Sequence, residues 1–438
     1  MASDFPSTLE DWLEYQSRVH PRPIELGLSR LGTVLERLEL RRPALPIVTV
    51  AGTNGKGSVV AMSSAILAAA GYRVGVFSSP HLRDYRERIR IGDRLVETRE
   101  LIQAFARIEA ARGEIGLTFF EYNTLAALVI FEAARLDAWV LEIGMGGRLD
   151  AVNVVDPDVA VVVSIGLDHQ EYLGETLEAI GREKAGIFRK GRAAVLGGRA
   201  LPAVVLDTAI AVGARPLRIG VQFDRVLDAE RWHYRGPRWD LPGLPAPNLR
   251  GAAQYDNAAT AIAALEQIAP PLVISAEAIA QGLRSVQLAG RFQVVEPLAA
   301  DRPTWILDVA HNPDAARVLA GHLRALPVKG RTIAVCGVLA DKDAVAVVAA
   351  LADVVDAWWF VSTEGERGQS GEALAARAGR GLKAPVAVAE TLAEACAAAL
   401  ATAAGGDRIV VFGSFHIVGP GLDWLEARGL LPLVDQRR

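Results

Sequence analysis

The sequence contains few cysteines, and this scarcity excludes a fold held together by disulfides. Only Cys336 and Cys396 occur among 438 residues, far apart and in apolar surroundings. Small secreted folds of the disulfide-framed class carry a much denser set. We therefore expect both thiols to be core residues of a protein in a reducing compartment, the cytoplasm.

Long apolar runs and an excess of positive charge are absent as well. No apolar run approaches the ~18 residues that a membrane-spanning helix needs, and residues 1–16 lack the basic-then-apolar pattern of a secretory signal. The 47 lysines and arginines face 51 aspartates and glutamates, a net charge of −4. No global field favours nucleic acid. We expect a cytoplasmic monomer that binds neither a membrane nor a nucleic acid.

One stretch has the pattern of a phosphate-binding loop. Residues 46–51 are apolar and β-branched, and Gly52-Thr53-Asn54-Gly55-Lys56-Gly57-Ser58 follows before a helical pattern. Glycines let backbone N–H groups converge on an anion at a helix N-terminus. Lys56 would neutralise phosphates and Ser58 could reach Mg²⁺. The spacing differs from the common Walker pattern, and the alternative is an ordinary glycine turn.

Strands and helices alternate after this loop, which predicts a parallel sheet with crossover helices. Ligands of such sheets bind at the carboxyl ends of the strands. Ser79, Glu142 and His169 each fall at such an end. A glutamate in an apolar strand is costly unless it is paired or metal-bound, so the three predict a Mg²⁺ site. The alternative for His169 is a capping or core histidine.

The second half of the chain repeats the alternation without a phosphate loop of its own. We expect residues 191–247 to form strands and loops flanking the main sheet, and the domains to span 1–295 and 296–438. Asp308 and His311 lie at the end of a strand, where they could contact a bound nucleotide. The alternative is that Asn312-Pro313 simply caps the following helix. On residue type alone, Lys184 is a solvated helix end and residues 20–27 are a structural turn.

Several motifs together resemble those of the Mur-ligase-like amide ligases, in the branch of the bacterial bifunctional dihydrofolate synthase/folylpolyglutamate synthases. Besides the phosphate loop, these are Ser78–Leu82, Glu142–Asp150, Arg182–Ile187, Asp308–Pro313 and Gly413–His416, in family order. The resemblance covers almost the whole chain. It implies an α/β fold with an N-terminal P-loop domain on a mostly parallel sheet and a smaller, Rossmann-like C-terminal domain.

The resemblance also implies ligands and residue roles. ATP would lie between the domains, held by Gly55, Lys56, Gly57, Ser58, Asn257, Arg291, Asp308 and His311. Mg²⁺ would be held by Ser79, Glu142, His169 and a carbamate formed on Lys184. Catalysis would fall to Lys56, Lys184 and His169. Pterin contacts would be Pro23, Ile24, Glu25, Leu26, Thr118, Leu149, Asp150 and Ala151. Many members carry Thr-Ile-Asp where this chain has Pro23-Ile24-Glu25.

The activity implied is ATP-dependent ligation of L-glutamate to dihydropteroate and to the γ-carboxylate of reduced folates, through an acyl phosphate. A cell-wall Mur ligase is a rival, but only about fifty residues precede the phosphate loop, too few for the extra N-terminal domain of that class. Folylpolyglutamate synthesis alone is a second alternative. A nucleotide switch is a third, which the second α/β domain argues against.

Overall fold

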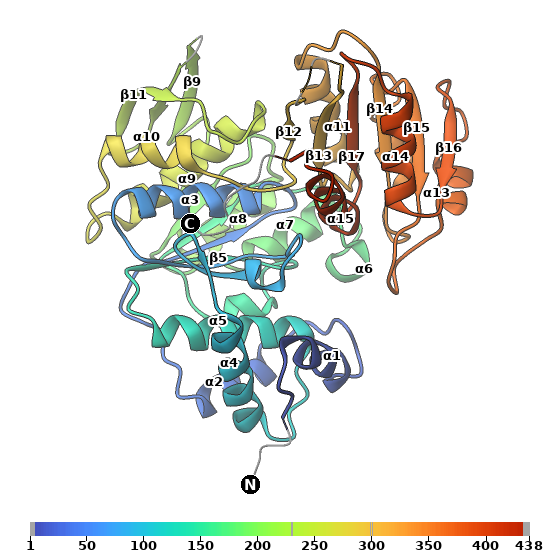
Figure 1. The fold of residues 1–438 in the computed structure, drawn as a ribbon. Helices are drawn as coiled ribbons and strands as arrows, with labels where there is room; N and C mark the ends of the chain where they lie inside the picture. Colours follow the sequence, from blue (N-terminus) through green and yellow to red (C-terminus); the bar gives the residue numbers. More distant parts are fainter. Residues whose placement is uncertain (1–4, 229–230, 298, 300, 432–438) are drawn as a thin grey trace. The chain divides into compact units, whose positions relative to one another are not determined.

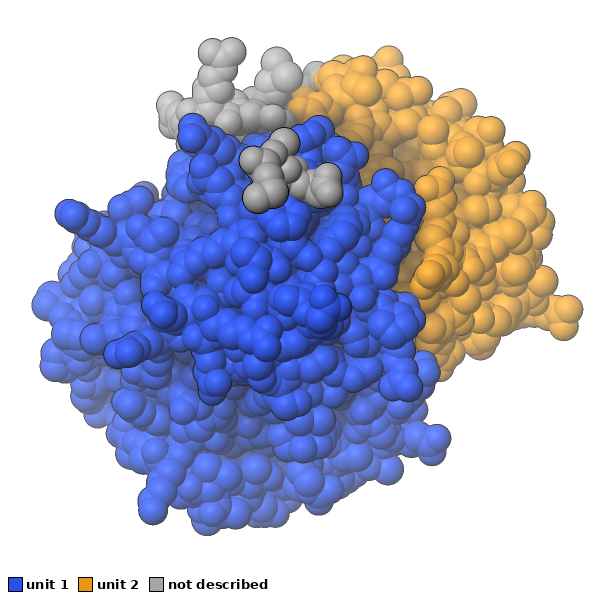
Figure 2. Space-filling model, turned by 90° about the horizontal axis from the view of Figure 1, so that it is seen from below, with its two compact units in different colours: residues 1–81, 85–248, 254–286 blue, residues 82–84, 249–253, 287–438 orange. Residues whose placement is uncertain are grey.

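The computed structural model describes residues 5–228, 231–297, 299 and 301–431, and the chain divides into two compact units. Unit 1 comprises residues 1–81, 85–248 and 254–286, and unit 2 comprises residues 82–84, 249–253 and 287–438 (Figure 2). The functional domain boundary expected from the sequence, between residues 295 and 296, stays a prediction.

Unit 1 is built on an eight-stranded sheet whose strands lie in the order β4-β3-β2-β5-β1-β6-β7-β8. The strands are β1 (Ile47–Ala51), β2 (Val74–Phe77), β3 (Ile89–Ile91), β4 (Arg94–Leu95), β5 (Ala138–Glu142), β6 (Val159–Val162), β7 (Ala193–Leu196) and β8 (Arg215–Arg218). β2, β5, β1, β6, β7 and β8 are parallel, and the β3–β4 hairpin joins β2 in antiparallel fashion. The predicted parallel sheet is confirmed, whereas the β3–β4 hairpin was not predicted from the sequence.

Helices cover both faces of this sheet (Figure 1). They are α1 (Leu9–Val19), α2 (Ser29–Arg37), α3 (Lys56–Ala69), α4 (Thr98–Arg112), α5 (Phe119–Ala133), α6 (Gln170–Leu173), α7 (Leu177–Ala185), α8 (Ala203–Val212), α9 (Ala253–Ile268) and α10 (Ala276–Ser285), with 3₁₀ turns η1 (Tyr85–Arg88) and η2 (Ala151–Val154). α3 packs on α10, and α4 packs on α5 and α1. β1 and β5 are wholly buried because helices lie on either side, as expected of apolar parallel strands.

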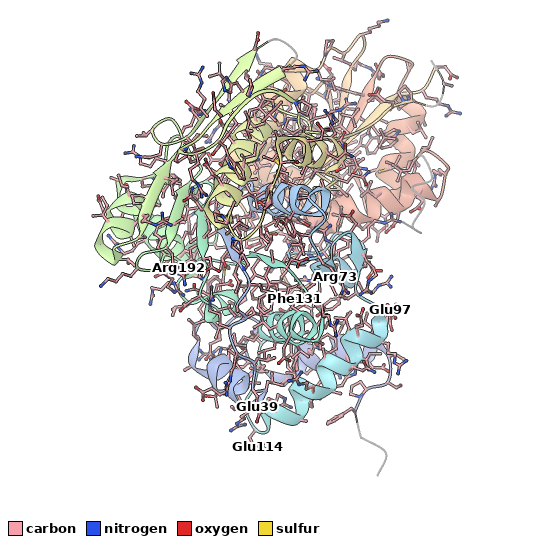
Figure 3. The ribbon with its side chains drawn as sticks, turned by 90° about the vertical axis from the view of Figure 1, so that its left-hand side faces the viewer. Glu39, Arg73, Glu97, Glu114, Phe131 and Arg192 are labelled. Carbon is pink, nitrogen blue, oxygen red and sulfur yellow. The ribbon has the colours of Figure 1, made fainter. Side chains whose placement is uncertain are left out.

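Apolar side chains of unit 1 are buried in its core, whereas charged side chains lie on its surface. Phe131 of α5 is 1% exposed and packs against Trp139 at a ring distance of 5.6 Å. The charged residues labelled with it in Figure 3, Glu39, Arg73, Glu97, Glu114 and Arg192, are all exposed.

Cys336 and Cys396 are buried free thiols in the core of unit 2, as predicted.

Residues 191–247 differ from the expectation of strands flanking the main sheet. β7 and β8 belong to the sheet itself and are joined by α8. α8 lies between Pro202 and Gly213 and is apolar apart from Asp207 and Thr208, so its sequence shows no clear helical period. Beyond it, β9 (Asp224–Asp228), β10 (Arg231–Arg235) and β11 (Asp240–Pro245) form a separate antiparallel sheet.

Unit 2 is the predicted second α/β domain. Its sheet has the order β12-β13-β17-β14-β15-β16 and is parallel except at β12. The strands are β12 (Gln293–Val295), β13 (Thr304–Asp308), β14 (Thr332–Cys336), β15 (Ala357–Val361), β16 (Val386–Ala389) and β17 (Arg408–Phe412). The helices are α11 (Pro313–Ala325), α12 (Ala344–Ala349), α13 (Gly371–Ala378), α14 (Leu392–Thr402) and α15 (Phe415–Glu426).

Candidate active site

The carboxyl ends of four neighbouring strands in unit 1 carry the predicted phosphate and metal residues. In the sheet, β2, β5, β1 and β6 are consecutive. Ser79 follows β2, Glu142 ends β5, the phosphate loop follows β1, and His169 lies beyond β6. The sequence order of these residues differs from their spatial order, and the parallel pairing brings them to one edge.

The phosphate loop is a close-fitting backbone turn. Gly55 caps α3 in the left-handed region with φ of 87°, and a Cβ there would lie 2.8 Å from Val163 Cγ1 and 2.9 Å from Asn257 Oδ1. A Cβ at Gly52 would lie 3.1 Å from the Ser164 nitrogen. Only glycine fits both positions. Asn257, predicted to contact the nucleotide, thus packs against the loop.

The end of β6 holds the loop in place. The Thr53 amide donates to the Ser164 carbonyl at 2.8 Å, and the Asn54 amide donates to Ser164 Oγ at 2.9 Å. The Gly166 amide donates to Thr53 Oγ1 at 3.0 Å. Sequence reasoning missed Ser164, whose only signal is a polar residue just beyond an apolar strand.

Two lysines meet at one backbone carbonyl. Lys56 Nζ donates to the Gly52 oxygen at 3.0 Å and to the Thr53 oxygen at 3.3 Å, and Lys184 Nζ donates to the same Gly52 oxygen at 3.1 Å. Residue type alone predicted that Lys184 is a solvated helix end, and that prediction is wrong. The side chain is 5% exposed.

The surroundings of Lys184 favour its neutral amine. Burial first, and then the positive charge of Lys56, lower the pKa of Lys184 from its ordinary 10.5 to about 7, although Asp168 and Asp150 act in the opposite direction. A buried ammonium loses hydration that one carbonyl does not replace. This lowered pKa makes the neutral amine of Lys184 far more accessible near neutral pH than that of an ordinary lysine.

The loop after β5 brings Lys184 to this position. The Arg148 amide donates to the Glu183 carbonyl at 2.8 Å. A Cβ at Gly147 would lie 2.7 Å from the Glu183 oxygen and 2.9 Å from the Lys184 Cα. The glycine-rich turn of the sequence thus permits a close approach of the C-terminal end of α7.

The predicted metal residues provide a mixed donor set. Glu142 is 4% exposed, and Ser79 and His169 are half-buried. His169 has a left-handed backbone with φ of 51°, and its amide donates to Asp168 Oδ1 at 2.9 Å. Within the described ranges there is no group of three or more His, Cys, Asp or Glu placed to hold a metal. A hydroxyl, a carboxylate and an imidazole can still serve a hard cation if phosphate oxygens and water complete its shell.

The predicted pterin residues lie close together in unit 1. The Gly27 amide, next to the segment Pro23–Leu26, donates to the Leu149 carbonyl at 3.1 Å. Thr118 is the buried N-cap of α5, and its amide donates to Glu121 at 2.7 Å. Pro23 is exposed, Ile24, Glu25, Leu26 and Leu149 are half-buried, and Ala151 is buried.

Arg30 connects two of these segments and was missed in the sequence. Its guanidinium pairs with Glu25, donates to the Glu25 carbonyl at 3.0 Å, and lies 3.1 Å from Glu121 Oε1. Glu121 is only 2% exposed. The loop Pro23-Ile24-Glu25 is therefore tied through Arg30 to Glu121 in the first turn of α5.

Asp150 binds backbone groups of its own loop. Its carboxylate accepts from the Met145 amide at 2.8 Å and from the Val152 amide at 3.0 Å. Burial raises the pKa of Asp150 to about 6, against the effect of these amides. In this structure Asp150 shapes the turn between β5 and η2.

Unit 2 brings its predicted nucleotide residues together. Asp308 accepts from the Phe292 and Ala310 amides, each at 2.8 Å, and burial raises its pKa despite the charge of Arg291. The Arg291 guanidinium lies 5.2 Å from the ring centroid of Phe415, and the His311 ring lies 6.4 Å from it. Phe415 was noted within a motif but not predicted as a site residue.

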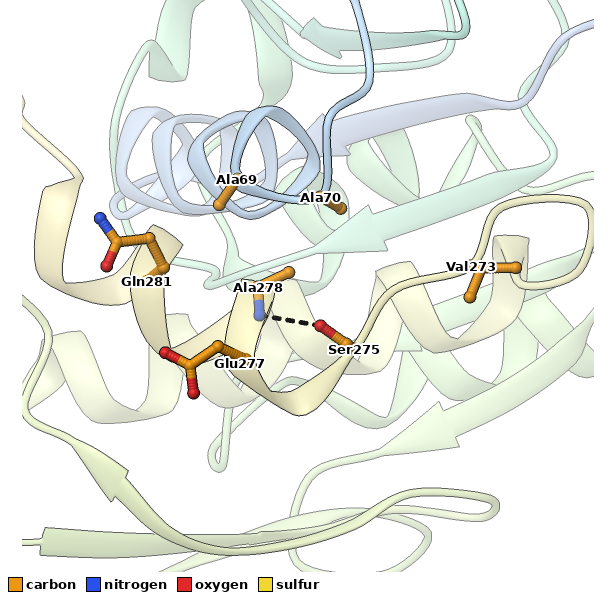
Figure 4. Close-up of a pocket in the computed structure, with 7 residues that line it drawn as sticks. All are labelled: Ala69, Ala70, Val273, Ser275, Glu277, Ala278 and Gln281. Atoms are coloured by element: carbon orange, nitrogen blue, oxygen red, sulfur yellow. Dashed lines mark hydrogen bonds between the residues drawn. The ribbon is translucent and has the colours of Figure 1, made fainter.

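A separate depression lies at the opposite end of α3. Ala69, Ala70, Val273, Ser275, Glu277, Ala278 and Gln281 line it (Figure 4). Ser275 Oγ accepts from the Ala278 amide at 3.1 Å as the N-cap of α10. None of its lining residues belongs to the candidate site, because α3 begins at the phosphate loop and ends here.

Comparison with known families agrees with this geometry. Residues 50–198 match the Mur ligase middle domain, and residues 290–415 match the glutamate ligase domain of Mur ligases. The fold and the site thus define a ligase of the Mur type.

More particularly, the chain belongs to the dihydrofolate synthase/folylpolyglutamate synthase family. It is 45% identical over 423 residues to the protein of that name from Escherichia coli (strain K12), covering 96% of both chains. The solved E. coli FolC in complex with DHPP and ADP has a TM-score of 0.91 and 44% identity, with 97% of this chain and 99% of that chain covered.

A Yersinia pestis bifunctional folylpolyglutamate synthase/dihydrofolate synthase complexed with AMPPNP and a Mn ion has a TM-score of 0.88. It is 45% identical, and 96% of this chain and 98% of that chain are covered. None of the helices in the described residues is long and apolar enough to cross a membrane.

Proposed function

We propose that the protein ligates L-glutamate to dihydropteroate and to the γ-carboxylate of reduced folates, with ATP as the energy source. The observation that carries this proposal is the pair of lysines on the Gly52 carbonyl, inside a phosphate loop flanked by Glu142 and His169. Membership of the family supports the substrate classes.

The loop of unit 1 supplies positive charge where phosphates would lie. The N-terminus of α3 presents backbone N–H groups beside the Lys56 ammonium. Such groups stabilise the charge that develops as a carboxylate attacks the γ-phosphate. The carboxylate oxygen bonds to phosphorus, ADP leaves, and the resulting acyl phosphate is open to attack by the glutamate amine, which expels phosphate.

Residues of both units would contact the nucleotide. We assign the phosphates to Gly55, Lys56, Gly57 and Ser58, with Asn257 packed against their loop. Arg291, Asp308 and His311 would contact the rest of ATP from unit 2. The buried Asp308 carboxylate and the Phe415 ring beside Arg291 form an environment suited to a ribose and base.

We assign a Mg²⁺ ion to Ser79, Glu142 and His169. A divalent cation there would neutralise phosphate charge during transfer. The buried Glu142 carboxylate fits this role, because an ion of opposite charge offsets the cost of burying it.

Lys184 would complete this set as a carbamate. A neutral amine attacks CO₂, a C–N bond forms, and one proton is released to solvent, leaving an anion. The lowered pKa of Lys184 supports this step. The anion would pair with Lys56 and could serve as a metal ligand, whereas an ammonium would repel the metal.

The pterin end of the acid substrate is assigned to Pro23, Ile24, Glu25, Leu26, Thr118, Leu149 and Ala151. Asp150 is assigned the indirect role of shaping the loop that carries Leu149. This assignment rests on the hydrogen bond between Gly27 and Leu149 and on the Arg30 ion pairs.

The proposal is tested by incubating the protein with ATP, Mg²⁺, L-glutamate and either dihydropteroate or tetrahydrofolate. Products one glutamate heavier, with one ADP released per bond, are expected for both acids. Activity with the folate alone would reduce the assignment to a folylpolyglutamate synthase. ADP release without either acid would contradict a ligase.

A further inference from the structure

Arg88 is a buried cation with few partners. It ends η1 beside β3 and is 8% exposed. Among the described residues its guanidinium donates one hydrogen bond, from Nε to His81 Nδ1 at 2.7 Å, and forms no ion pair. Arginine is almost never fully buried unless paired, and four of its five N–H donors remain for a ligand.

A second buried polar group, this one without a hydrogen-bond partner, lies beside Arg88. The Tyr85 hydroxyl is buried without a hydrogen-bond partner, and its ring lies 5.8 Å below the Arg88 guanidinium. Arg90, half-buried on β3, has no ion pair within the part of the chain that the structure describes. Glu87 and Glu142 exert attraction on both arginines, yet burial outweighs it and lowers the pKa of each.

The position of Arg88 links two predicted parts of the site. His81, its hydrogen-bond partner, follows Ser79 by two residues, and Ser79 is assigned to the metal. The Phe119 ring, 5.6 Å from the guanidinium, follows Thr118, which is assigned to the pterin end of the acid. Arg88 thus contacts a near neighbour of the proposed metal ligand Ser79 through His81, and the direct neighbour of the proposed pterin residue Thr118 through Phe119.

We propose that Arg88 binds the carboxylate of the acid substrate and orients it for attack on the γ-phosphate, and that Arg90 strengthens the local positive charge. A planar guanidinium matches a carboxylate with two parallel hydrogen bonds. This role rests on the proposed ligase function. Incoming L-glutamate also carries carboxylates, but the contact with Phe119 favours an acid with an aromatic body.

The first test compares Arg88→Met, which keeps volume and removes charge, with Arg88→Lys and the control Arg94→Met. Arg94 belongs to the adjoining hairpin, is exposed and pairs with Glu100. We expect the KM for dihydropteroate to rise on the order of tenfold to a hundredfold in Arg88→Met. The KM for dihydropteroate of Arg88→Lys should lie between those of Arg88→Met and wild type. The KM for ATP should be unchanged in all variants. A rise confined to the KM for L-glutamate would overturn the assignment.

The second test separates carboxylate recognition from a structural role. Dihydropteroate and its carboxamide, which lacks the charge, compete for the site in the presence of a non-hydrolysable ATP analogue. Wild type should bind the acid about tenfold or more tightly than the amide, and Arg88→Met should bind both about equally. If Arg88→Met fails to fold, the same comparison in Arg88→Lys decides.

Undiminished preference for the acid in a folded Arg88 variant would overturn the proposal. Failure of wild type to ligate either acid would instead refute the ligase assignment, so the two failures are distinct.

Discussion

Lys184 should make the activity depend on dissolved CO₂, with a pH dependence set by its amine. With a pKa of about 7, about 90% of the amine is neutral at pH 8 and about 9% at pH 6. An ordinary lysine with a pKa of 10.5 would be only about 0.3% neutral at pH 8. Burial beside Lys56 therefore raises the reactive fraction at pH 8 about 300-fold.

The assay removes CO₂ from the enzyme and then restores it. We expect activity to fall after exhaustive degassing at low pH and to recover when CO₂ is added at a fixed dissolved concentration. The recovery rate should rise about tenfold from pH 6 to pH 8, because the neutral fraction rises by that factor. Lys184→Ala should lose most activity, and acetate should restore part of it by occupying the vacated space.

A stability measurement gives an independent check in CO₂-free buffer. Because the folded-state pKa is lower than the unfolded one, the unfolded state binds the additional proton between pH 7 and 10.5, and the free energy of unfolding should rise with pH there. Lys184→Met should lack this slope. Full activity of Lys184→Ala, together with insensitivity of wild type to CO₂, would refute the reasoning.

Three further variants test other parts of the site. Gly55→Ala should lower both the melting temperature and the activity, because its Cβ would meet two side chains. The control Gly71→Ala has a similar φ of 89° but open space around it, so it should cost only backbone strain. Equal effects of the two substitutions would contradict the packing argument. Arg30→Ala should raise the KM for dihydropteroate severalfold but not that for ATP, since it frees the Glu25 loop, while the exposed control Arg18→Ala should change neither. Glu142→Gln should raise the Mg²⁺ concentration needed for half-maximal activity at least tenfold; an unchanged titration would remove Glu142 from the metal set.

Periodicity and local motifs were enough to predict the alternating fold and the glycine turn between β1 and α3. The strand–glycine–helix pattern of residues 46–58 is local, so neighbouring residues carry the whole signal. The burial of Lys184 is different, because it results from α7 packing on the turn at Gly147, 37 positions earlier in the chain. No pattern near Lys184 indicates that contact.

Long-range ion pairs were invisible in the sequence for the same reason. Arg30 and Glu121 are 91 positions apart, and either could have been an exposed charge on its own helix. α8 was missed because its apolar residues surround the helix instead of forming a stripe. Local sequence thus predicted elements and loops, while the side chains that connect distant segments required the structure.

The bonds from Ser164 and Gly166 to the phosphate loop have a consequence for affinity. A glycine-rich loop that is loose in the free protein must be ordered when its ligand arrives, and that entropy is subtracted from the binding free energy. Here Thr53 and Asn54 are already held by the neighbouring strand. The ordering of these residues is thus completed during folding, so a phosphate ligand of the proposed kind would bind this loop at a smaller entropic cost.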